Sequence, residues 1–196
     1  MVIVRLHRRA GGYVLHVPLF FSRSGQGLIE SCLVMALVCL VFFGVFQISQ
    51  LFASQEILDY AAGRGARSRT VGFNQFMVYK TVRVGAIPNA GVLVNPTHQG
   101  GPTQEYALER ARIPLYLGGE SRGGLKAILD YKEWDSIHGG DYHSLGDGTL
   151  VETVRQDVSL TNNPFHRAFY AGDTMPLGGT NTMDEHFTLY LDDQGW

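Results

Sequence analysis

The hydrophobic residues of this sequence are concentrated in one segment near the N-terminus. Residues 31–55 form a run of 25 positions without charge, and the centre of that run, residues 33–46, is almost entirely apolar. A helix rises about 1.5 Å per residue, so this run is long enough to cross a hydrocarbon core of about 30 Å. Because no proline interrupts it, the pattern predicts one continuous helix over residues 27–62, within a transmembrane and assembly segment at 26–62.

One face of this predicted helix carries a polar stripe. Gln47, Gln50 and Ser54 are spaced i, i+3 and i+7, which places them on the same side. Such a stripe either packs against another helix or marks the level at which the chain leaves the membrane for the headgroups. Gly44 is either a site of close approach or a residue without a special role.

After this helix the segments with regular hydrophobic periodicity become shorter. Residues 63–87 fit both helical and strand periods, and we favour a helical connecting segment that ends before Ile87 and Pro88. From residue 88 onward, five glycine doublets separate short elements and argue against long regular helices. The elements predicted there are helices at 104–112, behind Thr103 as N-cap, and 125–130, and strands at 150–160 and 186–191.

These elements predict an α+β fold class. A long N-terminal transmembrane helix is followed by a small extracytoplasmic domain with short helices and a few antiparallel strands. The corresponding domain organisation is a leader peptide at 1–25, the helix at 26–62, the connecting helical segment at 63–87 and the α+β domain at 88–196.

Charge is divided unevenly between the two sides of the apolar run. Four arginines precede it, at positions 5, 8, 9 and 23, whereas the chain from Glu56 onward carries 12 basic and 17 acidic residues. Positive residues tend to stay in the cytoplasm, so we expect a cytoplasmic N-terminus and an exported C-terminal domain. Arg64, Arg67 and Arg69 on the far side weaken this bias.

Other features limit the function classes. A basic leader before an apolar core also suits a secretory signal peptide, but no small-x-small cleavage site follows that core. Cys32 and Cys39 both lie inside the apolar run, so the predicted outer domain has no cysteine. No basic groove with interleaved aromatic residues is present, which argues against nucleic acid as a partner.

No residues with a recognisable catalytic pattern occur. His138, Asp141 and His143 lie close together, and His166 and His186 are further possible ligands, but the glycine-rich context predicts a solvated loop rather than a metal site. Serine-hydrolase, P-loop and dinucleotide-binding glycine patterns are missing. We therefore expect no catalytic residues, no metal and no cofactor. Four aromatic residues are predicted to be core or interface: Trp134, Tyr142, Phe169 and Tyr170.

The residues just before the apolar run carry the strongest functional signal. Ser24 to Glu30 read Ser-Gly-Gln-Gly-Leu-Ile-Glu, with Arg23 in front. This segment resembles the start of type IV pilin-like precursors, in which a membrane-embedded aspartic peptidase cuts after a glycine and a glutamate stands fifth in the mature chain. The resemblance implies cleavage between Gly25 and Gln26, which makes Glu30 the fifth residue.

Within that family the sequence is most similar to the TadE-like pseudopilins of the tight-adherence (Tad, or Flp) pilus machinery. An apolar helix there leads into a stretch rich in alanine and arginine, here residues 60–69, and the resemblance covers roughly residues 22–72. An aromatic residue often follows the glutamate, whereas this chain has Ser31. Major Flp pilins are also much shorter and lack a domain like residues 88–196, which points to a minor subunit.

The resemblance implies a minor pseudopilin of the bacterial inner membrane, single-pass, N-terminus inside, which acts in the assembly of a pilus or secretion fibre. The implied partners are a prepilin peptidase, other pilins and pseudopilins, an inner-membrane assembly platform and the lipid bilayer. The alternative is an uncleaved single-pass anchor whose outer domain binds a ligand or an envelope component. Cleavage after Gly25 distinguishes the two.

Glu30 is costly in a membrane helix, because a carboxylate at the bilayer centre costs about 2–3 kcal/mol. Cleavage after Gly25 would create an α-amine on Gln26 that can pair with the Glu30 carboxylate of a neighbouring subunit. Alternatively, Glu30 lies at headgroup depth, where the N-terminal end of the helix dipole favours it.

Overall fold

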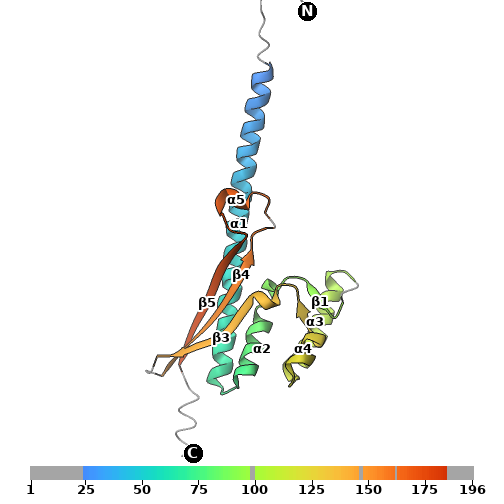
Figure 1. The fold of residues 1–196 in the computed structure, drawn as a ribbon, viewed down its shortest axis with the longest axis vertical. Coiled ribbons are helices and arrows are strands. Elements are labelled where there is room, and N and C mark those ends of the chain that lie inside the picture. Colours follow the sequence, from blue (N-terminus) through green and yellow to red (C-terminus); the bar gives the residue numbers. More distant parts are fainter. Residues whose placement is uncertain (1–23, 98–99, 146–147, 162, 185–196) are drawn as a thin grey trace, which may run out of the picture. The chain divides into compact units, whose positions relative to one another are not determined.

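A computed structural model describes residues 24–97, 100–145, 148–161 and 163–184 (Figure 1). Over these ranges the chain forms helices and antiparallel strands, which confirms the predicted α+β class. The chain divides into two compact units, residues 1–42 and 43–196. The first unit contains the N-terminal half of α1, and the second contains the rest of α1 and all other elements.

Helix α1 (Ser24–Thr70) is uninterrupted and extends eight residues beyond the predicted end at residue 62. Leucine and alanine support the helical conformation, and the alanine- and arginine-rich stretch at 60–69 continues it. The helix ends where Gly72 adopts a φ of +88°, with the Gly72 amide donating to the Arg69 carbonyl at 2.8 Å. Glycine is suited to this turn because it lacks the Cβ that disfavours positive φ.

Helix α2 (Gln75–Gly85) returns along the C-terminal part of α1. Asn74 caps it, since its side chain accepts a hydrogen bond from the Met77 amide at 2.9 Å. Small residues allow the two helices to lie close together: a Cβ on Gly85 would be 3.0 Å from the Cα of Ala61. The helical prediction for 63–87 is thus correct in type, but the segment contains the end of α1, a turn and α2, followed by a 3-10 turn, η1 (Ile87–Asn89).

Helix α3 (Pro102–Gly118) contradicts the expectation that no long helix follows residue 88. The glycine doublets lie just outside or at its ends, and Pro114, inside it, is exposed, so that water can bond the carbonyl that a proline leaves unpaired. Its N-cap is Gly101 rather than Thr103. Helix α4 (Arg122–Ile128) lies close to the predicted 125–130.

The strands form two antiparallel sheets. A small one pairs β1 (Leu93–Asn95) with β2 (Asp130–Tyr131), and a larger one has the order β3-β4-β5. Its strands are β3 (Ile137–Ser144), β4 (Thr149–Ser159) and β5 (Thr174–Asp184). Strand β4 confirms the strand predicted at 150–160. The predicted strand at 186–191 lies outside the described residues.

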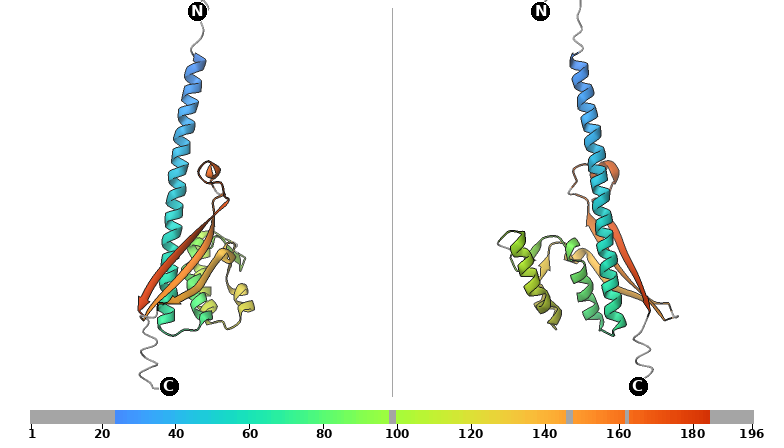
Figure 2. Two further views of the ribbon diagram at one scale, coloured as in Figure 1. Left: turned by 60° about the vertical axis from the view of Figure 1, so that its left-hand side comes forward. Right: turned by 180° about the vertical axis from the view of Figure 1, so that it is seen from behind.

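Two strands of the larger sheet were not predicted. The loop expected around His138 and His143 is strand β3, and β5 contains the doublet Gly178-Gly179 that was interpreted as a break. Gly179 serves packing rather than turning, because a Cβ there would collide with the backbone of Leu58 in α1. The C-terminal half of α1 lies along β5 (Figure 2). Gln55 and Asp59 of α1 bond the backbone of Gly178 and Thr180 in that strand.

The core of the second unit forms where α1, α2, α3 and the sheets meet. Trp134, in the short 3-10 turn η2 (Trp134–Ser136), is 1% exposed and contacts the rings of Tyr116 and Tyr131, with centroids at 5.4 and 4.8 Å. The buried Lys80 ammonium of α2 donates to the carbonyls of Leu117 and Gly119, at the end of α3. The last helix, α5 (His166–Phe169), is a single turn between β4 and β5.

Candidate membrane anchor and assembly helix

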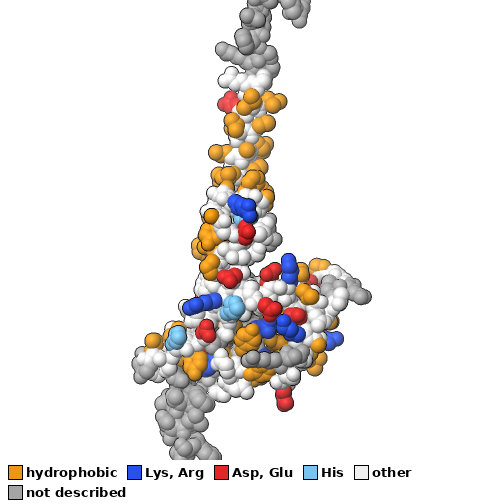
Figure 3. Space-filling model, in the orientation of Figure 1, with side chains coloured by type: hydrophobic (Ala, Val, Ile, Leu, Met, Phe, Trp, Pro, Cys, Tyr) orange, Lys and Arg blue, Asp and Glu red, His pale blue; other side chains and the backbone are white. Residues whose placement is uncertain are grey.

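The N-terminal half of α1 presents hydrophobic side chains on all sides. Leu33, Met35 and Phe42 are each about two-thirds exposed, at 66%, 66% and 65%. Figure 3 shows hydrophobic side chains distributed along this part of the helix on the face in view. Water-soluble domains rarely expose an apolar surface that is both continuous and this large, so lipid or neighbouring helices must cover it. In the described part of the chain, α1 is the helix that is long and apolar enough to cross a membrane.

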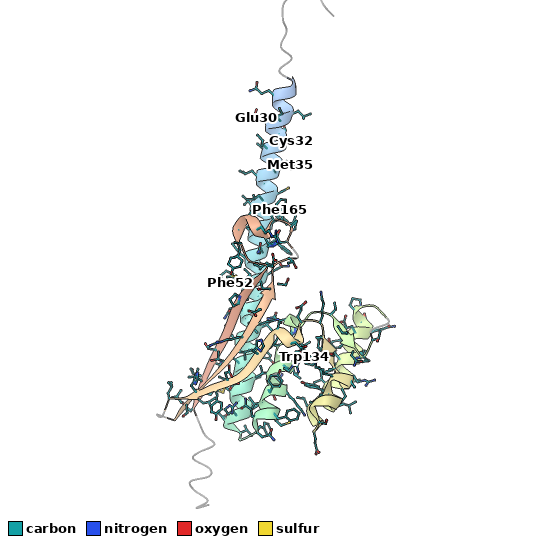
Figure 4. The ribbon with its side chains drawn as sticks, viewed as in Figure 1. Glu30, Cys32, Met35, Phe52, Trp134 and Phe165 are labelled. Carbon is teal, nitrogen blue, oxygen red and sulfur yellow. The ribbon has the colours of Figure 1, made fainter. Side chains whose placement is uncertain are left out.

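Glu30 is the charged residue of this half, two turns into α1, and its side chain is exposed (Figure 4). Across the described ranges no cation lies within ion-pair distance of its carboxylate. The next residue, Ser31, donates its hydroxyl hydrogen to the carbonyl of Gly27 at 2.8 Å. This bond satisfies the serine hydroxyl within the helix, which makes serine tolerable in an apolar environment.

Gly25 and Gln26 lie in the first turn of α1, and both are exposed. A Cβ built on Gly25 or on Gly27 would meet no atom within 4 Å. The fold of the described chain therefore has no packing need for glycine at these two positions. A requirement for Gly25 would have to come from another molecule that contacts this backbone.

The C-terminal half of α1 has different surroundings, beginning at Phe43. The side-chain amide of Asn163 donates to the Gln47 side-chain oxygen at 2.8 Å and to the Phe43 carbonyl at 3.2 Å. The Phe165 ring lies 5.3 Å from the Phe43 ring. Gln47 is only 6% exposed, so this member of the predicted polar stripe is bonded within its own domain rather than to a second membrane helix or to headgroups.

Gly44 is a site of close approach, one of the two possibilities that the sequence left open. A Cβ at this position would lie 2.8 Å from the ring of Phe169. Farther along α1, Leu58, Ala61, Ala62 and Ala66 are fully buried. The same helix thus exposes its apolar side chains before Phe43 and contributes to the domain core after it.

Arg69 belongs to the arginine cluster that weakens the predicted orientation. Its Nε lies 3.3 Å from a carboxylate oxygen of Glu152, a side chain with 0% exposure, and its guanidinium lies 3.7 Å from the centre of the Tyr142 ring. This arginine is therefore part of the folded domain, neutralised by an acidic partner. The location of Arg69 after the apolar run is thus accounted for by this ion pair, without assuming that this part of the chain is in the cytoplasm.

The histidines do not form a metal site among the residues that the structure describes. His138, Asp141 and His143 lie on β3 with exposed side chains. His166 lies elsewhere, with its Nδ1 2.8 Å from the Asn163 carbonyl and its Nε2 3.2 Å from Asp173. No group of three or more His, Cys, Asp or Glu side chains comes together within these ranges.

Of the four aromatic residues singled out, Trp134 is in the core, whereas Tyr142, Phe169 and Tyr170 are exposed by 48%, 48% and 41%. The sequence did not predict the contacts of Asn163, Phe165 and Asp173. The local sequence indicated that another segment packs on this part of α1 only through Gly44 and Gln47, a small and a polar residue one helical turn apart in the apolar run.

The family model described as TadE-like protein matches residues 25–67. Residues 25–67 of the chain are TadE-like. No curated protein and no solved structure matches the chain. The TadE-like segment begins at the glycine of the predicted junction, includes Glu30 and the whole exposed half of α1, and continues into the buried half. The similarity of this segment is to a pilus-associated, pseudopilin-like family, and the described chain has one helix that is long and apolar enough to serve as a membrane anchor.

Proposed function

We propose that this protein is a minor pseudopilin, cleaved after Gly25 and incorporated through α1 into a Tad-type pilus or its assembly complex. The observation that carries the proposal is the coincidence of three features in one helix. The TadE-like match at residues 25–67 includes residues 25–42, where the apolar side chains are exposed and the acidic Glu30 lies.

The proposed cleavage rests on the exposure of Gly25 and Gln26 and on the open space around them. A glycine on the peptidase side lets the backbone enter a narrow site that a side chain would obstruct. Cleavage leaves Gln26 with a free α-amine, four residues before Glu30. This amine and the Glu30 carboxylate of a neighbouring subunit are the pair that we propose for assembly.

The proposed orientation keeps the N-terminus in the cytoplasm. It rests on the arginines before the apolar run and the acidic excess after it. A reporter that is active only in the periplasm, fused after Trp196, should then be active. Activity from a cytoplasm-dependent reporter alone would exclude both the orientation and the pilin assignment.

The decisive experiment is N-terminal sequencing of the membrane-extracted chain after co-expression with a Tad-type prepilin peptidase. We expect a mature chain that begins at Gln26. Gly25→Leu should remain full length and inserted, whereas the matched control Gly27→Leu, at an equally open position, should be cut normally. A wild-type chain that keeps its first 25 residues would favour the uncleaved anchor whose outer domain binds a ligand or an envelope component.

A further inference from the structure

The aromatic side chains around the middle of α1 point to a second membrane contact. Three of them come from α5 and its borders: Phe165, Phe169 and Tyr170, which we call the aromatic foot. They are exposed by 40%, 48% and 41%. Phe46 and Phe52 of α1 are exposed by 51% and 68% in the same part of the helix, and Figure 4 shows Phe52 and Phe165 along this stretch.

The aromatic foot packs directly after the exposed apolar stretch of α1. Phe165 contacts Phe43, and the Phe169 ring occupies the space that Gly44 leaves by lacking a Cβ. Phe52 lies nine positions beyond Phe43, about 13 Å farther along the helix. Four partly exposed aromatic rings, those of the foot and Phe46, thus lie around the level at which the folded domain begins to pack on α1. Aromatic residues are enriched at this level of membrane proteins, since their rings suit the boundary between hydrocarbon and headgroups.

Polar bonds hold the backbone of this segment while leaving its rings exposed. Asn163 is tied to Gln47 and to the Phe43 carbonyl, and His166 is bonded between the Asn163 carbonyl and Asp173. The hydrogen bond from His166, together with the Arg167 guanidinium 3.3 Å away, lowers the pKa of the Asp173 carboxyl group. These bonds fix the backbone of the segment, and its surface combines the exposed rings with the exposed ion pair of Arg167 and Asp173.

We propose that the aromatic foot rests in the headgroup region of the lipid bilayer and sets the depth at which α1 is inserted. This inference depends on the proposed membrane anchoring by α1. Lipid is the occupant because the foot continues the apolar surface of the span. It adds a contact from a segment that lies more than one hundred residues later in the sequence than the anchor.

The proposed contact determines which part of α1 is in lipid. Residues 26–43 make a helix of about 27 Å at 1.5 Å per residue, close to the hydrocarbon thickness of about 30 Å. The uncharged run continues to residue 55, but with the foot at the boundary its last turns lie at or above the headgroups. Glu30 and Phe43 are thirteen positions apart, or about 20 Å of helix, so Glu30 then lies inside the hydrocarbon, where an amine partner is most valuable.

The test uses the full chain in vesicles of phosphatidylethanolamine and phosphatidylglycerol. Cys32→Ala and Cys39→Ala remove the native thiols, and single cysteines carry an environment-sensitive fluorophore. Ala168→Cys reports on the foot without removing a ring, because Ala168 is exposed on α5. Val38→Cys reports on the span, and Tyr106→Cys, at a side chain that is 63% exposed on α3, reports on the distal domain. Quenching is measured with aqueous iodide and with lipids that carry a nitroxide near the headgroup.

We expect lipid quenching and several-fold protection from iodide at residues 38 and 168, and iodide quenching alone at residue 106. If residue 38 is in lipid while residue 168 behaves like residue 106, the foot proposal is wrong and the anchor stands. If residue 38 is not quenched by lipid, the proposed anchoring itself fails. Protection of residue 168 from both quenchers would mean that a protein surface covers the foot, which also overturns lipid as the occupant.

Discussion

The two halves of α1 share one helical conformation but differ in what stabilises them. Residues 25–42 expose their hydrophobic side chains, and glycines at 25 and 27 have open space around them. After Phe43 one side of the helix packs into the domain: Leu58 and Ala61 are fully buried, and Gly65 has no room for a Cβ because it would lie 2.7 Å from a methyl group of Val82. Substitutions in the first half should therefore act on insertion and assembly, and those in the second half on folding.

The strongest effect on folding is expected at the ion pair between Arg69 and Glu152. Arg69→Met removes the cation next to a fully buried carboxylate, and breaking such a pair costs about 3–5 kcal/mol. Arg67, two residues earlier, is exposed, and Arg67→Met should change the free energy of unfolding by less than about 0.5 kcal/mol. Chemical unfolding of the detergent-solubilised chain measures both. Equal stability of the two variants would show that the buried pair contributes nothing.

A smaller loss is expected where β5 crosses α1. Gly179→Ala places a Cβ against the backbone of Leu58, so strand and helix must separate locally, at a cost of about 1–3 kcal/mol. Gly178→Ala is the matched control, because its Cβ would be in ordinary contact, 3.7 Å from the Val154 carbonyl. Thermal unfolding monitored by circular dichroism should separate the two variants. A larger effect at Gly178 than at Gly179 would contradict this packing.

Alkaline pH should destabilise the folded domain through its buried tyrosines. Burial raises the pKa of Tyr131, as does the hydrogen bond that its hydroxyl donates to Glu109 at 2.9 Å, and burial also raises the pKa of Tyr116. Above about pH 10 the unfolded chain loses these protons while the folded chain keeps them, so the free energy of unfolding falls as pH rises.

Urea unfolding at several pH values between 8 and 11 tests this prediction. Tyr131→Phe should flatten the decline of stability above pH 10, because phenylalanine has no proton to lose. The exposed Tyr106 provides the control, since Tyr106→Phe should leave the slope as in the unchanged chain. An identical slope in all three proteins would assign the alkaline effect to other groups.

The sequence predicted best what depends on local patterning. The apolar run predicted α1, and the alternation of apolar and polar residues over 150–160 predicted β4. Packing between distant segments was not predictable in the same way. A glycine doublet by itself indicates a turn, but Gly139 lies within strand β3. Glycine is needed at this position because the side chain of Val82 leaves no space for a Cβ. Similarly, Gly25 and Glu30 can be recognised as candidate functional residues because they belong to one short motif. The hydrogen bond between Gln47 and Asn163 joins residues 116 positions apart, and no local pattern predicts it.

The smallest effect on folding, and the sharpest test of the comparison, is expected at Glu30. Glu30→Gln changes an exposed side chain that forms no ion pair within the described residues, so the unfolding of the domain should stay the same within about 0.5 kcal/mol. Insertion should not suffer either, because the variant no longer carries a charge into lipid. What it loses is the attraction between the carboxylate and the Gln26 amine of a neighbour, a few kcal/mol when partly shielded from water. We therefore expect normal insertion and cleavage after Gly25, with reduced co-purification of partner pilins and reduced incorporation into the fibre. Glu56→Gln, at an exposed acidic residue after the apolar run, is the matched control and should assemble normally. Normal assembly of the Glu30 variant would place its carboxylate at the headgroups without a partner, and loss of cleavage would assign Glu30 to recognition by the peptidase.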